Sequence, residues 1–315
     1  SSTTTPKPSI TRWKTHKPPS GALPAAKVGY GLRASLDVPS EIGYHQSRKY
    51  ADDHPRQPSS NIVTRSRCFR PRVHLKMRDQ YAGNVSDFLK YALLRQLASS
   101  GARRLGVAWY YIPAQDGRAD GHHFEWQDDE DWAALDPELH RSLRSLPERS
   151  VAALEERHFW PSGTLFHSDP VPRLSRKRSE WLNGLRAVFE PANLVFLDPD
   201  NSIGKVSRKH ATLDELSGLR APGRTLAFIK FPNFSRRHSL QLEDLHETLT
   251  STFGPCSPQT LTISVTLPNR NRPGYFHPRI RWFTVIDGDE AIHWKLRDFA
   301  SGLCQLRRVQ AKVHG

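Results

Sequence analysis

The chain has 315 residues and a 37% hydrophobic composition, enough for one large domain or two small ones with a sizeable core. Its formal net charge of +14 suits a polyanionic partner, because Lys and Arg release counterions when they neutralise phosphates. The sequence has no apolar run long enough to cross a membrane, and Cys68, Cys256 and Cys304 lack the spacing of a disulfide framework or a zinc knuckle. These features argue against membrane and disulfide-rich classes. They predict a cytoplasmic protein without a membrane partner, and they leave the oligomeric state open.

The first segment, residues 1–76, is rich in Pro, Ser, Thr, Arg and Lys and shows neither helical nor strand periodicity. Its first 75 residues hold 13 Lys and Arg against 4 Asp and Glu, so most of the net charge lies here. We expect a disordered basic segment, either an arm that follows nucleic acid or a tail without a role. The only methionine, Met77, directly precedes the first convincing helix, which makes it a candidate initiator and residues 77–315 the folded domain.

Strands and helices alternate after Met77. A leucine at every fourth position predicts a helix over 86–98, capped by Asn84 or Ser86. Asp136-Pro137 is typical of a helix start, and Thr212 to Glu215 has the pattern of a capping box. Further helices are expected over 176–189, 239–253 and 290–300, and strands over 105–112, 164–167, 194–197, 225–231, 261–267 and 280–286.

This alternation predicts an α/β fold with a Rossmann-like, doubly wound and mostly parallel sheet. No clear helix separates the last two expected strands, so we expect one of them to be an antiparallel edge strand. Ligands of such sheets bind at the carboxyl ends of the strands, and three of the first four expected strand ends carry an acid. Those ends are 113–121, 168–170, 198–201 and 230–234.

Asp198 gives the sharpest signal, because it directly follows four apolar residues and must be partly desolvated or hydrogen-bonded. The alternative is an Asp that caps the next turn. Asp200, two residues on, would allow a paired-carboxylate Mg²⁺ site of a nuclease or phosphodiesterase. Phe228 stands where the acid-x-Lys motif of such nucleases, ending at Lys230, would place its acid.

Three other groups of side chains have ordinary structural explanations. His122 and His123, with the acids of 128–131, predict a solvated loop, since adjacent strand residues point to opposite faces. The aromatic residues 109–111 predict a buried strand. The best candidate for a nucleic-acid surface within the domain interleaves arginines with aromatic rings: Arg270, Arg272, Tyr275, Phe276, Arg279 and Arg281.

The stretch Tyr81-Ala82-Gly83-Asn84-Val85-Ser86-Asp87-Phe88-Leu89-Lys90-Tyr91 resembles the opening of an uncharacterised bacterial protein family. More distantly it resembles the ribosomal RNA adenine-N6 methyltransferases, whose opening pattern is Ala-Gly-Asn-x-x-Asp-x-Leu-Lys-His. The likeness continues at Asp198-Pro199, the position of that family's Asp-Pro-Pro-Tyr motif, and at Phe231-Pro232. It spans about residues 80–234.

The resemblance implies a Rossmann-like domain that binds S-adenosylmethionine and methylates an amine of a base in RNA or DNA. It implies a catalytic turn of Asp198, Pro199, Asp200 and Asn201, in which Asp198 accepts a hydrogen bond from the target amine. The residues implied at the cofactor are Asn84, Asp87, Lys90, Tyr91, Asp116, Gly117 and Asp169. Those implied at the substrate are Phe231, Pro232, Asn233 and Phe234.

The chain departs from the family pattern at three places. Gln115-Asp116-Gly117 stands where the family has its glycine-rich cofactor loop, Asp200-Asn201 replaces the second Pro and the aromatic residue, and Tyr91 replaces a histidine. The sequence therefore leaves three readings: a methyltransferase-like protein, a Mg²⁺-dependent nuclease or phosphodiesterase using Asp198 and Asp200, and an inactive Rossmann-like binding module.

Overall fold

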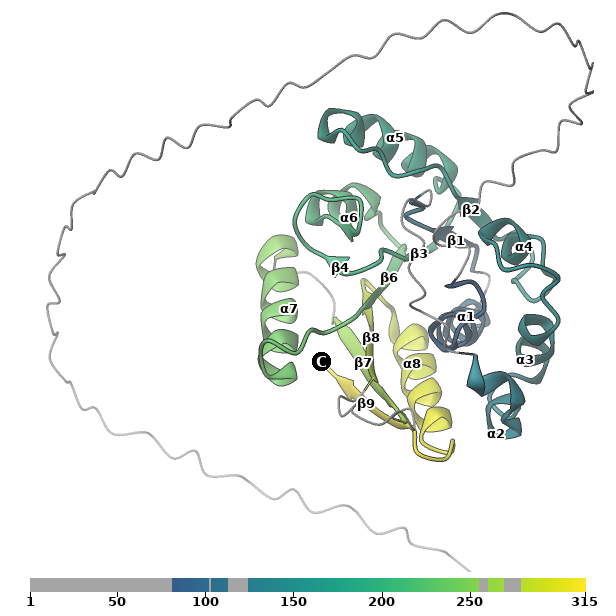
Figure 1. Ribbon diagram of the computed structural model, residues 1–315. Coiled ribbons are helices and arrows are strands. Elements are labelled where there is room, and N and C mark those ends of the chain that lie inside the picture. Colours follow the sequence, from purple (N-terminus) through teal and green to yellow (C-terminus); the bar gives the residue numbers. More distant parts are fainter. Residues whose placement is uncertain (1–80, 102, 113–123, 255–259, 269–278) are drawn as a thin grey trace, which may run out of the picture. The chain divides into compact units, whose positions relative to one another are not determined.

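The computed structural model describes residues 81–101, 103–112, 124–254, 260–268 and 279–315. Strands and helices alternate along most of this part of the chain (Figure 1). The helices are α1 (Val85–Ala98), α2 (Glu130–Ala133), α3 (Pro137–Arg144), α4 (Val151–Glu155), α5 (Arg178–Val188), α6 (Leu213–Leu219), α7 (His238–Phe253) and α8 (Glu290–Leu303), with the short 3-10 helices η2 (Glu125–Asp128) and η3 (Ser175–Lys177). The strands are β1 (Leu105–Ala108), β2 (Leu165–His167), β3 (Leu194–Leu197), β4 (Ser202–Ile203), β5 (His210–Ala211), β6 (Thr225–Lys230), β7 (Leu261–Leu267), β8 (Arg279–Ile286) and β9 (Gln310–His314).

Seven of the described strands form one mixed sheet in the order β2-β1-β3-β6-β8-β7-β9. The first four are parallel to one another. β8 runs antiparallel to both of its neighbours, β6 and β7, and β9 pairs antiparallel with β7 at the edge. Five strands therefore share one direction, and the protein is a mixed α/β structure with a mostly parallel sheet.

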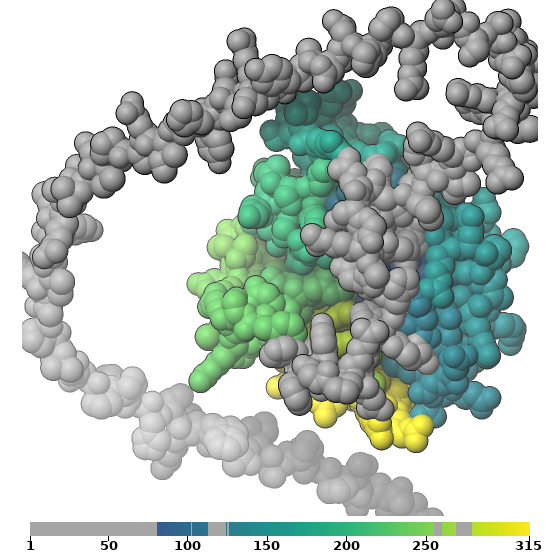
Figure 2. All heavy atoms as spheres, in the orientation of Figure 1, coloured from purple at the N-terminus to yellow at the C-terminus, as the bar shows by residue number. Residues whose placement is uncertain are grey.

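Helices cover both faces of the sheet, because successive strand residues point to opposite sides. In β3, Leu194 and Phe196 belong to a core with α1, α3, α4 and α8, whereas Val195 and Leu197 belong to a second core with α5, α6 and α7. All four residues are fully or almost fully buried. In the space-filling view, the surface formed by α2 to α4 is teal-blue and that formed by α6 and α7 is green (Figure 2). Burial on both faces explains why β3 is an uninterrupted apolar run.

The expected helices form with small shifts of their ends. Asn84 is the N-cap of α1, and Asp136 caps α3 with Pro137 at its first position, as the sequence predicts. Thr212 and Glu215 form the expected capping box of α6. The short α2 and α4 were not predicted, because helices of one turn carry too few residues to show periodicity.

The strands differ from expectation at three points. The first ends at Ala108 instead of Ile112, because Tyr110 has a positive φ of 48° that strand geometry does not allow. The expected antiparallel strand exists as β8, but it lies inside the sheet, so its placement at the edge was wrong. The edge is β9, whose sequence Gln-Ala-Lys-Val-His is too short and too polar to stand out.

Several expectations fall outside the described residues: the disordered segment 1–76, Met77, the strand end that holds Asp116 and Gly117, the pair His122 and His123, and the arginine and aromatic residues within 269–278. The acids of 128–131 close η2 and begin α2, where Asp129 is the N-cap. Among the described helices, none combines the length and the hydropathy needed to span a membrane.

We predict that Gly106→Ala destabilises the fold. A Cβ atom at this position of β1 would lie 2.7 Å from Cδ1 of Phe189, a ring that is itself fully buried. Overpacking of this kind costs about 1–3 kcal/mol of unfolding free energy, measurable by equilibrium urea unfolding. The matched control is Gly218→Ala within α6, where the nearest atom would lie 3.4 Å away. That change should be neutral or should stabilise by up to about 1 kcal/mol. Equal effects at both positions would contradict the packing argument.

Candidate functional site

The order in which strands are added to the sheet reverses between β1 and β3. From β1 the chain proceeds outward to β2, then returns to add β3 on the other side of β1. Open α/β sheets bind ligands outside the carboxyl ends of their strands at such a switch point. Tyr110 follows β1 at this edge, and Asp198 follows β3, with its amide donating to the carbonyl of Ala108 at 2.9 Å. The start of α1 lies at the same edge, because its other end leads into β1.

A buried charge cluster joins α1 to the end of β3. The Nζ of Lys90 lies 2.8 Å from Oδ1 of Asp87 and 2.9 Å from the carboxylate of Asp198. All three residues are less than 9% exposed. Two buried carboxylates therefore share the ammonium of Lys90 at this edge.

The first turn of α1 holds this cluster in place. Oδ1 of Asn84 accepts from the amides of Ser86 and Asp87, which is the ordinary chemistry of a helix N-cap. Oδ2 of Asp87 accepts from the amide of Gly83 at 2.9 Å, and Gly83 has a φ of 79° that suits glycine. Lys90 is one turn further along, so the spacing of Asp87 and Lys90 places both on one side of the helix.

The pKa of Lys90 is raised above its ordinary value. Burial alone lowers it, but the charges of Asp198 and Asp87 outweigh that effect. The lysine is therefore protonated at neutral pH. A hard cation such as Mg²⁺ at Asp198 would have to displace this ammonium, and no group of three or more possible metal ligands exists among the described residues. The geometry thus gives no support to the paired-carboxylate metal site.

Tyr91, expected at the cofactor, lies in the core beneath the cluster. Its ring stacks on Phe159 with centroids 5.6 Å apart and contacts Trp160. Burial, followed by the charges of Asp87 and Asp198, raises the pKa of Tyr91 well above its ordinary value. The phenol therefore stays neutral, and its ring supports the cluster from below.

The turn after β3 separates its four residues by environment. Asp198 and Pro199 are buried, Asp200 is half-buried, and Asn201 is exposed. The amide of Asn201 donates to the carbonyl of Lys209 at 2.9 Å, so the turn is fixed against the segment that leads into β5. The predicted site thus has a desolvated half, Asp198-Pro199, and a solvated half.

The turn after β6 contributes two aromatic rings of different exposure. Phe231 packs partly against the core, whereas Phe234 is 58% exposed. The backbone of Asn233 fixes the turn. Its backbone N–H donates to Oε1 of Gln241, and its backbone carbonyl accepts from Nε2 of the same glutamine. Phe231 to Phe234 therefore follow β6 at the same edge of the sheet as Asp198, because β3 and β6 are parallel neighbours.

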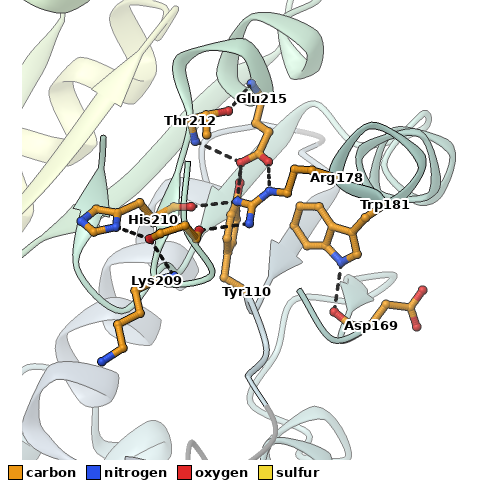
Figure 3. Close-up of polar contacts among 9 residues, drawn as sticks. Tyr110, Asp169, Arg178, Trp181, Lys209, His210, Thr212 and Glu215 are labelled. Carbon is orange, nitrogen blue, oxygen red and sulfur yellow. Dashed lines mark hydrogen bonds and ion pairs between the residues drawn. The ribbon is translucent and has the colours of Figure 1, made fainter. Parts of the chain in front are cut away.

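Asp169 lies on the opposite side of the switch point, at the carboxyl end of β2. Its carboxylate is 80% exposed, while its carbonyl accepts from Nε1 of Trp181 (Figure 3). Burial lowers the pKa of the nearby His167. The negative charge of Asp169 raises this pKa, but by a smaller amount. Asp169 thus shares the edge of the sheet with Asp198 without contacting it in any described interaction.

A second buried network, drawn in Figure 3, was not predicted as a network. Glu215 pairs with Nε and Nη2 of Arg178, accepts from the hydroxyl of Tyr110 at 2.9 Å, and closes the capping box with the amide of Thr212. Arg178 also donates to the carbonyls of Ser207 and His210. The network fixes Tyr110, the residue with the positive φ directly after β1. Only the capping box was visible in the sequence.

Comparison with known proteins adds little. No protein-family model matches the chain, and no curated protein matches it. A solved structure with some likeness is protein LPL1258 from Legionella pneumophila, described as family DUF519. It is 12% identical, covers 74% of this chain and 98% of its own, and has a TM-score of 0.40. A likeness at this level supports no argument about function.

We predict that Lys90→Met lowers the free energy of unfolding by about 3–5 kcal/mol at neutral pH, because two buried carboxylates lose their cation. Lys177→Met, which replaces an exposed lysine, should change it by no more than about 0.5 kcal/mol. The raised folded pKa of Lys90 means that its contribution is complete below the unfolded pKa of about 10.4 and is lost as the pH rises through the folded pKa. Urea unfolding between neutral and alkaline pH should therefore show the gap between wild type and Lys90→Met narrowing above about pH 10.4. A gap that widens there would contradict the assignment.

We also predict that Glu215→Ala costs about 3–5 kcal/mol of unfolding free energy, because it leaves the buried guanidinium of Arg178 without its carboxylate. The control is Asp244→Ala, which breaks the pair with Arg236 on the surface, where both side chains are about half exposed. An exposed pair contributes about 0–1 kcal/mol. Thermal or urea unfolding of both variants measures the difference, and similar losses would show that burial does not set the strength of the Glu215 network.

Proposed function

We propose that the protein is a Rossmann-like, S-adenosylmethionine-dependent methyltransferase that acts on an amine of a nucleic-acid base. The observation that carries the proposal is the buried carboxylate of Asp198 at the carboxyl end of β3, beside the switch point of the sheet. Support also comes from the opening sequence from Tyr81 to Tyr91, whose first turn builds the Asp87 and Lys90 cluster under that carboxylate.

The donor set fits the cofactor in its chemistry. Asp169 offers an exposed carboxylate at the end of β2, the position from which an acid binds ribose hydroxyls in dinucleotide-binding sheets. The carboxylates of Asp87 and Asp198 are groups of the kind that attract a positively charged centre. When bound, S-adenosylmethionine would supply an electrophilic methyl group on a cationic sulfur.

Asp198 would orient the acceptor amine. A carboxylate oxygen that accepts an N–H hydrogen bond fixes the direction of the nitrogen lone pair, and it stabilises the positive charge that develops on nitrogen as the new bond forms. Lys90 positions this carboxylate through the contact at 2.9 Å. Phe234, exposed beside the turn, offers a face on which a base can stack, as aromatic side chains do in single-stranded nucleic-acid recognition.

The test measures cofactor binding and transfer separately. We expect calorimetry to show binding of S-adenosylmethionine to the full-length protein, and labelled methyl groups to appear in RNA or DNA. Asp198→Asn should lower the transfer rate by about 100- to 1000-fold, in the range found when one transition-state contact is removed. Asp214→Asn, at an exposed position in the first turn of α6, should leave the rate unchanged.

Absence of cofactor binding by protein that unfolds cooperatively would overturn the proposal. Mg²⁺-dependent cleavage of nucleic acid that is lost in Asp200→Ala would replace it with the nuclease reading. If neither activity appears and Asp198→Ala leaves nucleic-acid binding intact, the binding-module reading replaces it.

A further inference from the structure

Arg281, in β8, is a partly buried arginine whose hydrogen-bond partners are neutral. Nε donates to Oγ of Ser86 at 2.8 Å, and Nη1 donates to the carbonyl of Ile280 at 2.9 Å. Both acceptors are neutral. Among the described residues, four other partly buried arginines pair with a carboxylate, namely Arg95 with Asp136, Arg103 with Asp289, Arg178 with Glu215 and Arg220 with Asp287. These hydrogen-bond partners of Arg281, like those of Arg157 and Arg224, are neutral groups.

The surroundings of Arg281 increase the cost of its charge. Burial, followed by the nearby charge of Arg279, lowers the pKa of Arg281 to about 10, so the group is still charged at neutral pH. Ser86 belongs to the first turn of α1, where the helix dipole is positive and a cation is unfavourable. A bound anion would therefore stabilise this partly desolvated guanidinium at the positive end of the helix.

The guanidinium is also fixed in orientation. Its Cζ lies 4.7 Å from the centre of the Phe231 ring, and the bond to Ser86 holds the Nε side. The remaining N–H groups form the kind of planar fork that pairs with phosphate oxygens. The amides at the start of α1 are already bonded to Asn84 and Asp87, so an anion would bind chiefly to the guanidinium.

The position of Arg281 in the sheet indicates whether its anion belongs to the cofactor or to the nucleic-acid acceptor. Because β8 runs against β6, the beginning of β8 lies at the carboxyl edge, with Lys230 opposite Trp282. β8 is two strands from β3, about 10 Å, on the side away from the β1 and β3 switch point. The cofactor is expected at the switch point, so an anion at Arg281 belongs to the acceptor.

We propose that Arg281, held by Ser86 and stacked on Phe231, binds a backbone phosphate of the nucleic-acid acceptor. The proposal rests on the proposed function in that this function makes the acceptor a nucleic acid. A base at Asp198 and a phosphate at Arg281 would be separated by a span comparable to one nucleotide. Arg281 would thereby set which nucleotide is presented to Asp198.

The test uses the salt dependence of RNA binding by the full-length protein. The probe is a short single-stranded RNA with a 5′-hydroxyl and a 3′-fluorescein, followed by fluorescence anisotropy over a series of KCl concentrations. Loss of one phosphate contact lowers the slope of log K against log [KCl] by about 0.7 for a single strand. We expect this decrease in Arg281→Met, the wild-type slope with weaker binding in Arg281→Lys, and no change in Arg186→Met.

Arg186 is the matched control because it is an exposed arginine near the end of α5, which leads to the opposite edge of the sheet. An unchanged slope in Arg281→Met, or no salt-dependent binding by the wild type, would overturn the proposal. Displacement of the RNA by inorganic phosphate, beyond the effect of KCl at equal ionic strength, would indicate a monoester site and would also overturn it. If Arg281→Met does not unfold cooperatively, Arg281→Lys decides, since a purely structural arginine would leave RNA affinity unchanged in a folded lysine variant.

Calorimetry with S-adenosylmethionine on the same proteins separates this proposal from the proposed function. Arg281→Met should bind the cofactor as the wild type does. A wild type that binds no cofactor but shows the slope change in Arg281→Met would lose the methyltransferase assignment and keep the phosphate site. Cofactor binding with an unchanged slope would have the opposite meaning.

Discussion

The ion pair between Lys90 and Asp198 connects two segments that are more than one hundred residues apart in sequence. It fixes the beginning of α1 against the carboxyl end of β3. It also places a carboxylate at the switch point between β1 and β3. A buried pair of this kind contributes little net stability compared with apolar packing, but removal of one partner is costly. The arrangement is therefore sensitive to loss of either residue.

The parts of the fold that were predictable are those that local chemistry determines. Asn84, Asp136 and Thr212 begin helices because their side chains accept from nearby amides, and this depends on a few consecutive residues. The apolar run of β3 is likewise local. The position of β8 depends on which strands pair, a long-range property on which its own sequence is silent. That is why its direction was anticipated and its place in the sheet was not.

The candidate site was predictable to the same extent. Asp198 was recognisable because a carboxylate follows four apolar residues. Its pairing with Lys90 was not, because only the fold brings the two together. The sequence named Arg281 within a row of arginines and aromatic residues, but its hydrogen bonds to Ser86 and Ile280 depend on packing that the sequence does not show. For Tyr91 the sequence suggested a functional place that the packing does not match. Its neighbours in sequence implied a position at the cofactor, whereas its ring lies in the core against Phe159.

β8 runs antiparallel to β6 and β7. The carboxyl edge of the sheet therefore has two halves, and different chain connections lead into each half. Pro268, after β7, and Arg279, at the start of β8, both lie at the carboxyl edge, so the connection between them starts and ends on the Arg281 side of Asp198. The connections after β1 and β2 start on the other side. Changes of length or composition between Pro268 and Arg279 would therefore act on the Arg281 side of the edge and leave the geometry around Asp169 unchanged.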